Sequence, residues 1–272
     1  MSGNRTPDRD PTTTFDAATL VHPNAEDPTR VTATLDASWS SLRGIHGGYI
    51  AAIFARATQS VVGQRSLRTV SISFLRVGEP GPVCIGIQMI RAGRSVSIVG
   101  LTMHQGGREI AVARATAMSP KVGSSWDNAP RLELIARELC EPLQSPQLVR
   151  HFEHCEALLD PAYMPFQVVD EALVRGYFRP RESCQIDAVW LAMALDWFPP
   201  AAFTRVPPPT GGISVDYTIH IHRTRAALTP DEWLRAQFQQ DCSNDGLALE
   251  TGTIADTDGT LIAQSFHTRY TG

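Results

Sequence analysis

The chain has 272 residues, of which 43% are hydrophobic and 19% are charged, with a formal net charge of -4. This balance is typical of a folded globular protein, offers no basic surface to nucleic acid, and leaves no apolar run long enough to span a membrane. Five scattered cysteines without a C-x-x-C pair support neither a disulfide framework nor a zinc ribbon. With a polar start that lacks a signal-peptide core, these features predict a cytoplasmic protein.

The first predicted elements are a short strand and a long helix. Residues 1–14 are rich in Thr, Pro, Asp and Arg, which is typical of a disordered start. A strand is predicted near 32–35, and a helix over roughly 47–62. The helix has an apolar face, because hydrophobic residues recur at helical spacing at Ile50, Ile53, Phe54, Ala57 and Val61.

An antiparallel meander of strands is predicted after this helix, because polar and apolar residues alternate between Gly- and Pro-containing turns. The expected strands cover 69–74, 83–89, 95–104 and 109–118. Residues 119–150 break the pattern with several prolines and glycines, and only a short helix is expected there, at 132–139. A connection of this length between two patterned halves predicts a domain boundary.

The second half repeats the order of the first. An apolar helix is predicted over 186–198, ended by Pro199-Pro200, and strands are predicted at 213–223, 232–240, 246–254 and 260–270. The segment 232–240 is also compatible with a helix that begins at Pro230-Asp231.

Both halves end on the same short pattern, Gly-x-x-Ile-Ala, at 107–111 and at 259–263. We therefore expect an N-terminal domain over 15–120, a linker over 121–150 and a C-terminal domain over 151–272. Each domain would be a helix packed against about four antiparallel strands, which is an α+β arrangement.

The paired glycines Gly47-Gly48 are the main candidate for chemistry. First-turn N–H groups of a helix lack intrahelical partners and lie at its positive dipole end. Glycine lets a ligand approach that backbone, so the geometry suits a carbonyl oxygen that becomes negative during a reaction. The alternative is that the two glycines only give clearance to a tightly packed helix.

Several segments together resemble a known family. They are Gly47-Gly48, Phe74-Leu75-Arg76, Val215-Asp216-Tyr217, Glu232-Trp233-Leu234, and Asp258-Gly259 through His267. Their order and spacing over residues 30–272 resemble the double hotdog acyl-CoA thioesterases of the medium-chain thioesterase II type. The resemblance implies two repeats of a curled antiparallel sheet wrapped round a central helix. It also implies an acyl-CoA substrate, no metal or cofactor, no nucleic-acid or membrane partner, and a homodimer or higher homo-oligomer.

The resemblance also implies site residues. In that family the Gly-Gly helix binds the thioester carbonyl, which places the carbonyl at the Gly48 N–H, while an Asp, a Thr or Ser and a Gln hold the attacking water. Asp216 matches the family Asp. Counting along the chain puts Asp241 where Thr is usual and His267 where Gln is usual. Residues next to these positions are expected to bind substrate: His46, Gly47, Tyr49 and Ser243.

Some of these residues have simpler explanations. Asp216 and Asp241 are also typical turn residues, and His46 is a plausible helix cap. If Asp216, Asp241 and His267 converge, the two carboxylates repel each other, and a protonated His267 or a protonated Asp would relieve the repulsion.

The leading functional hypothesis is hydrolysis of an acyl-CoA to free acid and coenzyme A by Asp-activated water. Two alternatives stay open. One is a non-catalytic acyl-thioester binding protein, which would bind tightly without turnover. The other is a hotdog enoyl hydratase or 3-hydroxyacyl dehydratase, which would act without releasing thiol.

Overall fold

The computed structural model describes residues 14–121, 123, 126–144, 149–205 and 212–270. Residues 1–13, nearly all of the segment expected to be disordered, lie outside these described ranges. Within the ranges, no helix is both long enough and apolar enough to cross a membrane.

The first half contains one long helix and five main strands. They are β2 (Arg30–Leu35), α2 (Gly47–Val62), β5 (Ser66–Phe74), β6 (Gly81–Ala92), β7 (Val96–Gln105) and β8 (Arg108–Met118). Short elements precede and follow β2: α1 (Phe15–Ala18), β1 (His22–Pro23), η1 (Ala37–Trp39), β3 (Ser40–Ser41) and β4 (Gly44–Ile45).

The second half has a shorter helix among its strands. Its main elements are β10 (Cys155–Leu159), β11 (Ala172–Pro180), α3 (Ala188–Ala194), β12 (Ile213–Ile221), β13 (Leu234–Asn244), β14 (Leu247–Ala255) and β15 (Leu261–Tyr270). The remaining pieces are short: η2 (Arg137–Leu139), β9 (Glu141–Pro142), η3 (Arg150–His154), η4 (Pro161–Tyr163) and η5 (Ala201–Thr204).

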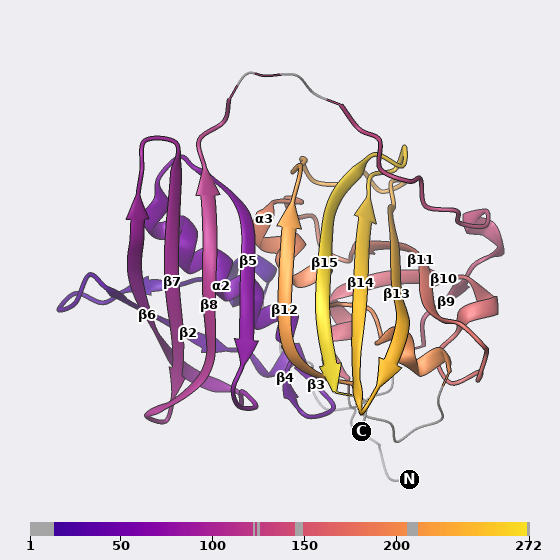
Figure 1. Ribbon diagram of the computed structural model, residues 1–272, viewed down its shortest axis with the longest axis horizontal. Helices are drawn as coiled ribbons and strands as arrows, with labels where there is room; N and C mark the ends of the chain where they lie inside the picture. The colour runs from indigo at the N-terminus through magenta and orange to yellow at the C-terminus, as the bar shows by residue number, and fades with distance from the viewer. Residues whose placement is uncertain (1–13, 122, 124–125, 145–148, 206–211, 271–272) are drawn as a thin grey trace, which may run out of the picture.

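One antiparallel sheet runs through both halves (Figure 1). Its order is β1-β2-β6-β7-β8-β5-β12-β15-β14-β13-β11-β10-β9, with β5 and β12 paired at the centre. Each half follows the same path along the chain, a strand, a helix and four antiparallel strands: β2-α2-β5-β6-β7-β8 and β11-α3-β12-β13-β14-β15. The repeated order expected from the sequence is therefore present.

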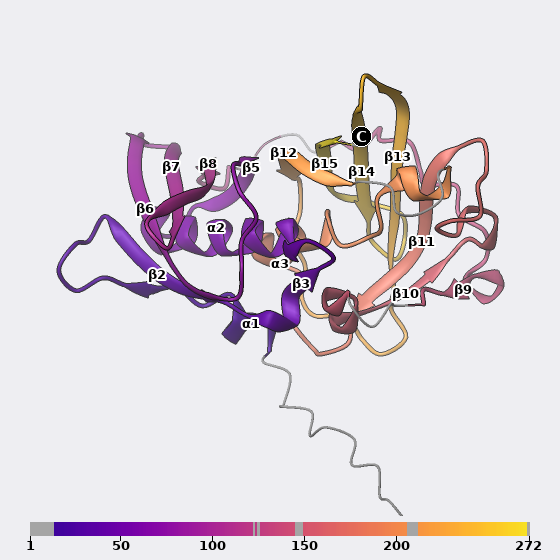
Figure 2. The same cartoon turned by 90° about the horizontal axis from the view of Figure 1, so that it is seen from below.

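The two helices lie side by side on one face of the sheet (Figure 2). The sheet curls so that α2 contacts all five main strands of its half, and α2 also contacts α3. Because α2 is covered from several sides, every residue from Gly48 to Ala55 is buried. This explains why the helix is apolar over more of its circumference than a surface helix.

Two predicted elements are shorter in the structure. Helix α3 begins at Ala188, because the Asp187 carboxylate accepts hydrogen bonds from the next backbone N–H groups, and it ends at Ala194 rather than 198. The expected helix at 132–139 is reduced to the single 3₁₀ turn η2. The ambiguous segment 232–240 belongs to strand β13, where the residues from 234 to 240 alternate between buried and half-buried.

Candidate active site

The site begins at Asp196, two residues after α3 ends. Its side chain is only 4% exposed, and its Oδ2 accepts a hydrogen bond of 2.7 Å from the backbone N–H of Gly48. That N–H belongs to the first turn of α2, where backbone donors have no intrahelical partner and the helix dipole favours an anion. The start of α2 in one half therefore holds a carboxylate supplied by the other half.

The paired glycines allow this close contact. A Cβ atom at Gly48 would lie 2.6 Å from the Met193 carbonyl oxygen and 3.0 Å from the Asp196 Cβ. At Gly47 it would lie 3.0 Å from the Asp196 Oδ2 and 3.1 Å from Phe74. The glycines thus give the start of α2 clearance from the end of α3, as well as a donor for the carboxylate.

His46 caps α2 and also contacts Asp196. Its Nδ1 accepts a hydrogen bond from the Tyr49 N–H, so Nε2 carries the ring proton. Nε2 lies 2.8 Å from the Asp196 carbonyl oxygen and 3.4 Å from its Oδ2. The expected capping role of His46 is confirmed.

Strand β15 contributes two buried side chains to the same place. His267 is 1% exposed, and its Nδ1 lies 3.3 Å from the Asp196 Oδ1. Neither ring nitrogen of His267 has a hydrogen-bond partner among the described residues. Two positions further on, Arg269 donates from Nη2 to the Asp196 Oδ1 at 2.9 Å. A buried imidazole without hydrogen bonds is uncommon, so both ring nitrogens of His267 are candidates for a hydrogen bond to a water or a ligand atom.

The imidazoles of this site are neutral at physiological pH. Burial, reinforced by the nearby Arg269 cation, lowers the pKa of His267 from 6.5 to about 3. Burial also lowers the pKa of His46 to about 4 and that of His151, which stacks on His46, well below its usual value. The low pKa argues against the protonated His267 considered from the sequence, because desolvation outweighs the attraction of the carboxylate.

Asp216 does not reach the site. Side chains alternate across β12: Tyr217 is fully buried against the helices, and Asp216 is half-buried on the opposite face of the sheet. There its Oδ1 accepts a hydrogen bond from the Thr268 hydroxyl. The expectation that Asp216 faces the paired glycines is wrong, because the sheet separates them.

Three other expected site residues also lie elsewhere. Asp241 and Ser243 are exposed at the far end of β13, beyond a register shift that follows Gln240, and the Gln239 side-chain amide donates to Asp241. Tyr49 is fully buried, stacks on Trp39 and donates its hydroxyl to backbone carbonyls. Tyr49 is thus a core residue, and the Gly48 N–H, expected to be open for a carbonyl, is used by Asp196.

The neighbouring N–H, that of Gly47, is open. Gly47 is half-exposed, and its N–H donates to no acceptor within the described ranges. It is the first residue of α2 and lies beside Phe74 and the Asp196 carboxylate. A backbone donor for an incoming carbonyl is therefore available next to the carboxylate, one residue before the predicted position.

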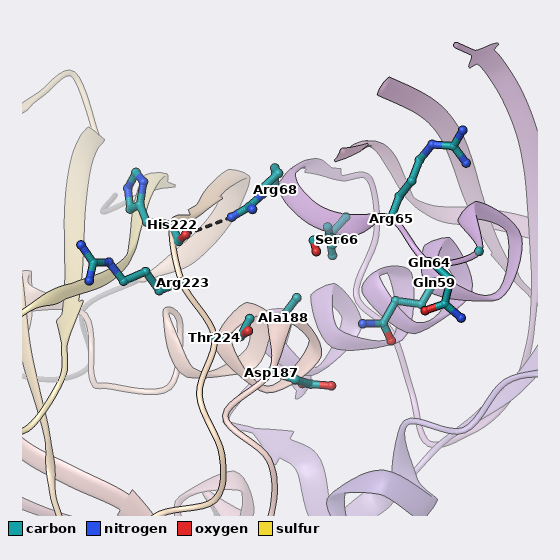
Figure 3. Close-up of a pocket in the computed structure, with 12 residues that line it drawn as sticks. Gln59, Gln64, Arg65, Ser66, Arg68, Asp187, Ala188, His222, Arg223 and Thr224 are labelled. Carbon is teal, nitrogen blue, oxygen red and sulfur yellow. Dashed lines mark hydrogen bonds between the residues drawn. The ribbon is translucent and has the colours of Figure 1, made fainter. Parts of the chain in front are cut away.

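A cavity of about 560 Å³ lies at the opposite end of the helix pair, where α2 ends and α3 begins (Figure 3). Its arginines are already engaged: Arg68 donates to the carbonyl of His222, and Arg65 donates to that of Gly93. The side chains of Arg65 and Arg223 point away from the centre of the cavity. The buried acidic and imidazole groups gather at the other end, around Asp196.

Comparison with protein families decides the identity of the chain. The family model for the acyl-CoA thioesterase N-terminal domain matches residues 35–118, and that for the acyl-CoA thioesterase C-terminal domain matches residues 127–270. The chain belongs to the acyl-CoA thioesterase family. It is a thioester hydrolase. A comparison with curated protein sequences found no match.

Several solved structures are similar in fold to this thioesterase over nearly its whole length. A protein assigned as a thioesterase II from Thermobifida fusca YX is 22% identical, with a TM-score of 0.84, over 97% of this chain and 99% of that one. A hot dog fold protein of unknown function from Alicyclobacillus acidocaldarius is 18% identical, with a TM-score of 0.84, over 95% and 97%. Acyl-CoA thioesterase II TesB2 from Mycobacterium marinum is 18% identical, with a TM-score of 0.73, over 95% and 96%. The thioesterase therefore has a hotdog fold.

The sequence analysis missed three site residues: Asp196, Glu250 and Arg269. Each is buried, at 5%, 2% and 4% exposure, and most of the residues that share its buried face are small or apolar. Asp196 follows the uninterrupted apolar run 188–195, and Arg269 shares the inward face of β15 with Ala263, Ser265 and His267. A charged residue at a buried position of a helix or strand pattern must be paired with another polar group. The sequence pattern alone could therefore have indicated these residues.

The depressed pKa of His267 predicts a pH-dependent stability. Between pH 6.5 and about 3, the unfolded chain takes up a proton at this residue and the folded thioesterase does not, so folding stability falls as the pH falls. His267→Gln removes this contribution. From pH 7 to pH 5 the wild type should lose about 2 kcal/mol more free energy of unfolding than the variant, measured by urea denaturation. Equal losses would show that His267 is not held neutral.

Proposed function

We propose that this thioesterase hydrolyses an acyl-CoA to free acid and coenzyme A, with a water that Asp196 activates. The observation that carries the proposal is the pairing of a buried carboxylate with a buried, hydrogen-bond-deficient imidazole at the start of α2. A water that contacts both the Asp196 carboxylate and the ring of His267 would give that ring its missing hydrogen bond. A carboxylate in hydrogen-bond reach of a water acts as a general base.

The reaction would use the two glycines for different tasks. The Gly48 N–H fixes Asp196, and the thioester carbonyl accepts from the Gly47 N–H. Asp196 takes a proton from the water while the water oxygen adds to the carbonyl carbon. The negative charge that forms on the carbonyl oxygen lies at the positive end of α2. Collapse of this intermediate breaks the carbon–sulfur bond, and the thiolate of coenzyme A receives the proton from Asp196.

We infer that each half is one hotdog unit, so the chain is a double hotdog with domains at 15–120 and 151–272 joined by the linker 121–150. The repeated order of elements and the single β5–β12 junction support this division. We also propose a homodimer or higher homo-oligomer. Its support is a set of exposed apolar residues on the outer face of β14 and β15: Leu247, Leu249, Phe266 and Tyr270.

The proposal is tested with a panel of acyl-CoA substrates and detection of free thiol. A single turnover in water labelled with ¹⁸O should place one labelled oxygen in the released acid and none in the protein, because no covalent acyl intermediate forms. Tight binding of acyl-CoA without thiol release would instead identify a binding protein. Labelled oxygen in the protein would identify a nucleophilic carboxylate that forms an anhydride with the acyl group, and would contradict direct attack by water.

The role of His267 gives a separate prediction. His267→Phe keeps a flat ring and removes both nitrogens, so kcat should fall about 100-fold. His267→Gln keeps a donor and an acceptor, and its kcat should stay within about tenfold of the wild type. Both variants are assayed by thiol release at saturating substrate. A wild-type rate for His267→Phe would exclude His267 from the site of the water.

The contact between Asp196 and two histidines also fits a second candidate, an enoyl hydratase, because an acidic group beside an imidazole suits proton transfer to and from carbon. A hotdog neighbour, the dehydratase domain of PpsC from Mycobacterium tuberculosis in complex with C12:1-CoA, has a TM-score of 0.53 at 13% identity. Hydration of crotonyl-CoA without thiol release would favour this activity, and thiol release alone would exclude it.

A further inference from the structure

Arg269 is a buried cation held between two buried carboxylates. Its Nη2 donates to the Asp196 Oδ1 at 2.9 Å, and its Nε donates to the Glu250 Oε1 at 2.7 Å. Glu250 is in turn fixed through its Oε2, which accepts from the Ala201 N–H at 2.7 Å and from the Gln240 side-chain amide at 3.2 Å. Every oxygen of Glu250 is therefore bonded, and its carboxylate anchors the guanidinium.

A buried ion cluster of this kind contributes little to folding stability. Removing three charges from water costs several kcal/mol each, and well-packed apolar side chains in the same place are often equally stable. Glu250 and His267 are direct partners across β14 and β15, so the carboxylate that anchors Arg269 lies one strand away from the imidazole of the site. The cluster thus adjoins both Asp196 and His267.

We propose that Arg269, anchored by Glu250, is a positioning residue that keeps the Asp196 carboxylate negatively charged and turned toward His267. This inference rests on the proposed role of Asp196 in hydrolysis. Arg269 acts on Asp196 as a cation in direct contact, and Glu250 acts on it as a second negative charge beyond the guanidinium. The two therefore influence the same carboxylate in opposite directions.

The other titratable groups that face Asp196 from the surrounding elements are uncharged, in contrast to Arg269 and Glu250. His46 at the start of α2, His151 in η3 and His267 in β15 all have a pKa lowered by burial, so they are neutral. Burial raises the pKa of Tyr217 in β12 well above its usual value, so its hydroxyl keeps its proton. Arg269 and Glu250 are therefore the charged side chains among the described residues around Asp196.

The test is the position of the Asp196 carboxylate in crystal structures of three variants of the full chain. Arg269→Met removes the donor that lies 2.9 Å from the Asp196 Oδ1, so this oxygen should move away from the Nδ1 of His267. Glu250→Gln keeps Arg269 but removes its charged anchor, so the guanidinium should stay on Asp196 and the carboxylate should move less. Arg269→Lys keeps a cation and should displace the carboxylate less than Arg269→Met does.

Activity gives the second readout. Arg269→Met should lower kcat about 30-fold and move the acid limb of kcat/KM to higher pH, Arg269→Lys should recover part of kcat, and Glu250→Gln should move the limb to lower pH. Shifts in the same direction, or no shift, would overturn the proposal and leave the cluster a purely structural one. If Arg269→Met does not fold, Glu250→Gln and Arg269→Lys decide. A wild type without thiol release contradicts the proposed function, and the variant structures still decide the role of Arg269.

Discussion

Replacing Asp196 by asparagine is expected to lower kcat for acyl-CoA hydrolysis by about 1,000-fold, because the amide cannot take a proton from water. Asparagine has the same shape, and its amide oxygen still accepts the hydrogen bond from the Gly48 N–H. Its NH2 group then faces the donor Arg269, so some folding stability should be lost, while Glu250 still pairs Arg269. Thiol release under saturating substrate measures the loss. Unfolding by urea at pH 7 checks that the variant is folded.

Asp216→Asn is the matched control for this variant. It makes the same chemical change in the residue that the family resemblance assigns to catalysis, but on the opposite face of the sheet. Its kcat should stay within about twofold of the wild type, since a half-buried side chain remote from the reacting atoms contributes little to the barrier. The reverse pattern, with Asp196→Asn active and Asp216→Asn inactive, would contradict the site described here.

The second large effect is expected for Gly48→Ala. The new methyl group would meet the Met193 carbonyl oxygen at 2.6 Å and the Asp196 Cβ at 3.0 Å, so α2 and α3 must move apart. Overpacking of this kind costs about 2 to 3 kcal/mol of folding stability, which corresponds to a decrease in Tm of roughly 4 to 10 °C for a chain of this size. The same shift separates the Gly48 N–H from Asp196, so activity should fall at temperatures where the variant is still folded.

Gly123→Ala is the control for Gly48→Ala, because a methyl group at Gly123 would meet nothing within 4 Å among the residues that the structure describes. Its Tm and its kcat should equal those of the wild type. Differential scanning calorimetry and thiol release measure both quantities. A Gly48→Ala variant with the wild-type Tm would show that the two helices approach each other less closely than described.

Much of the fold follows from local patterns in the sequence. The bounds of α2 agree with the predicted helix, and the meanders β5–β8 and β12–β15 agree with the alternating segments to within a few residues. These elements bury a face with a regular period, and that period is visible along the chain. The expected 132–139 helix shrank to one turn and α3 is shorter than predicted, since neither segment has a long amphipathic pattern.

The site was harder to predict, because it depends on contacts between the halves. His46, Gly47, Gly48 and His267 were named from the sequence and lie together around Asp196, but Asp196 was not named, since it lies at the end of an apolar segment with no motif of its own. Asp216 was assigned to the wrong face of β12. Which face of a strand is buried depends on its pairing with β5 and β15, and a shift of one residue reverses the assignment.

The position of a bound substrate is the most direct test of the account. A crystal structure with a non-hydrolysable acyl-CoA analogue should show the carbonyl oxygen about 3 Å from the Gly47 nitrogen, with a water in hydrogen-bond contact with both the Asp196 carboxylate and His267. An analogue whose carbonyl lies on the outer face of the sheet beside Asp216, with no water or ligand near Asp196, would contradict the account.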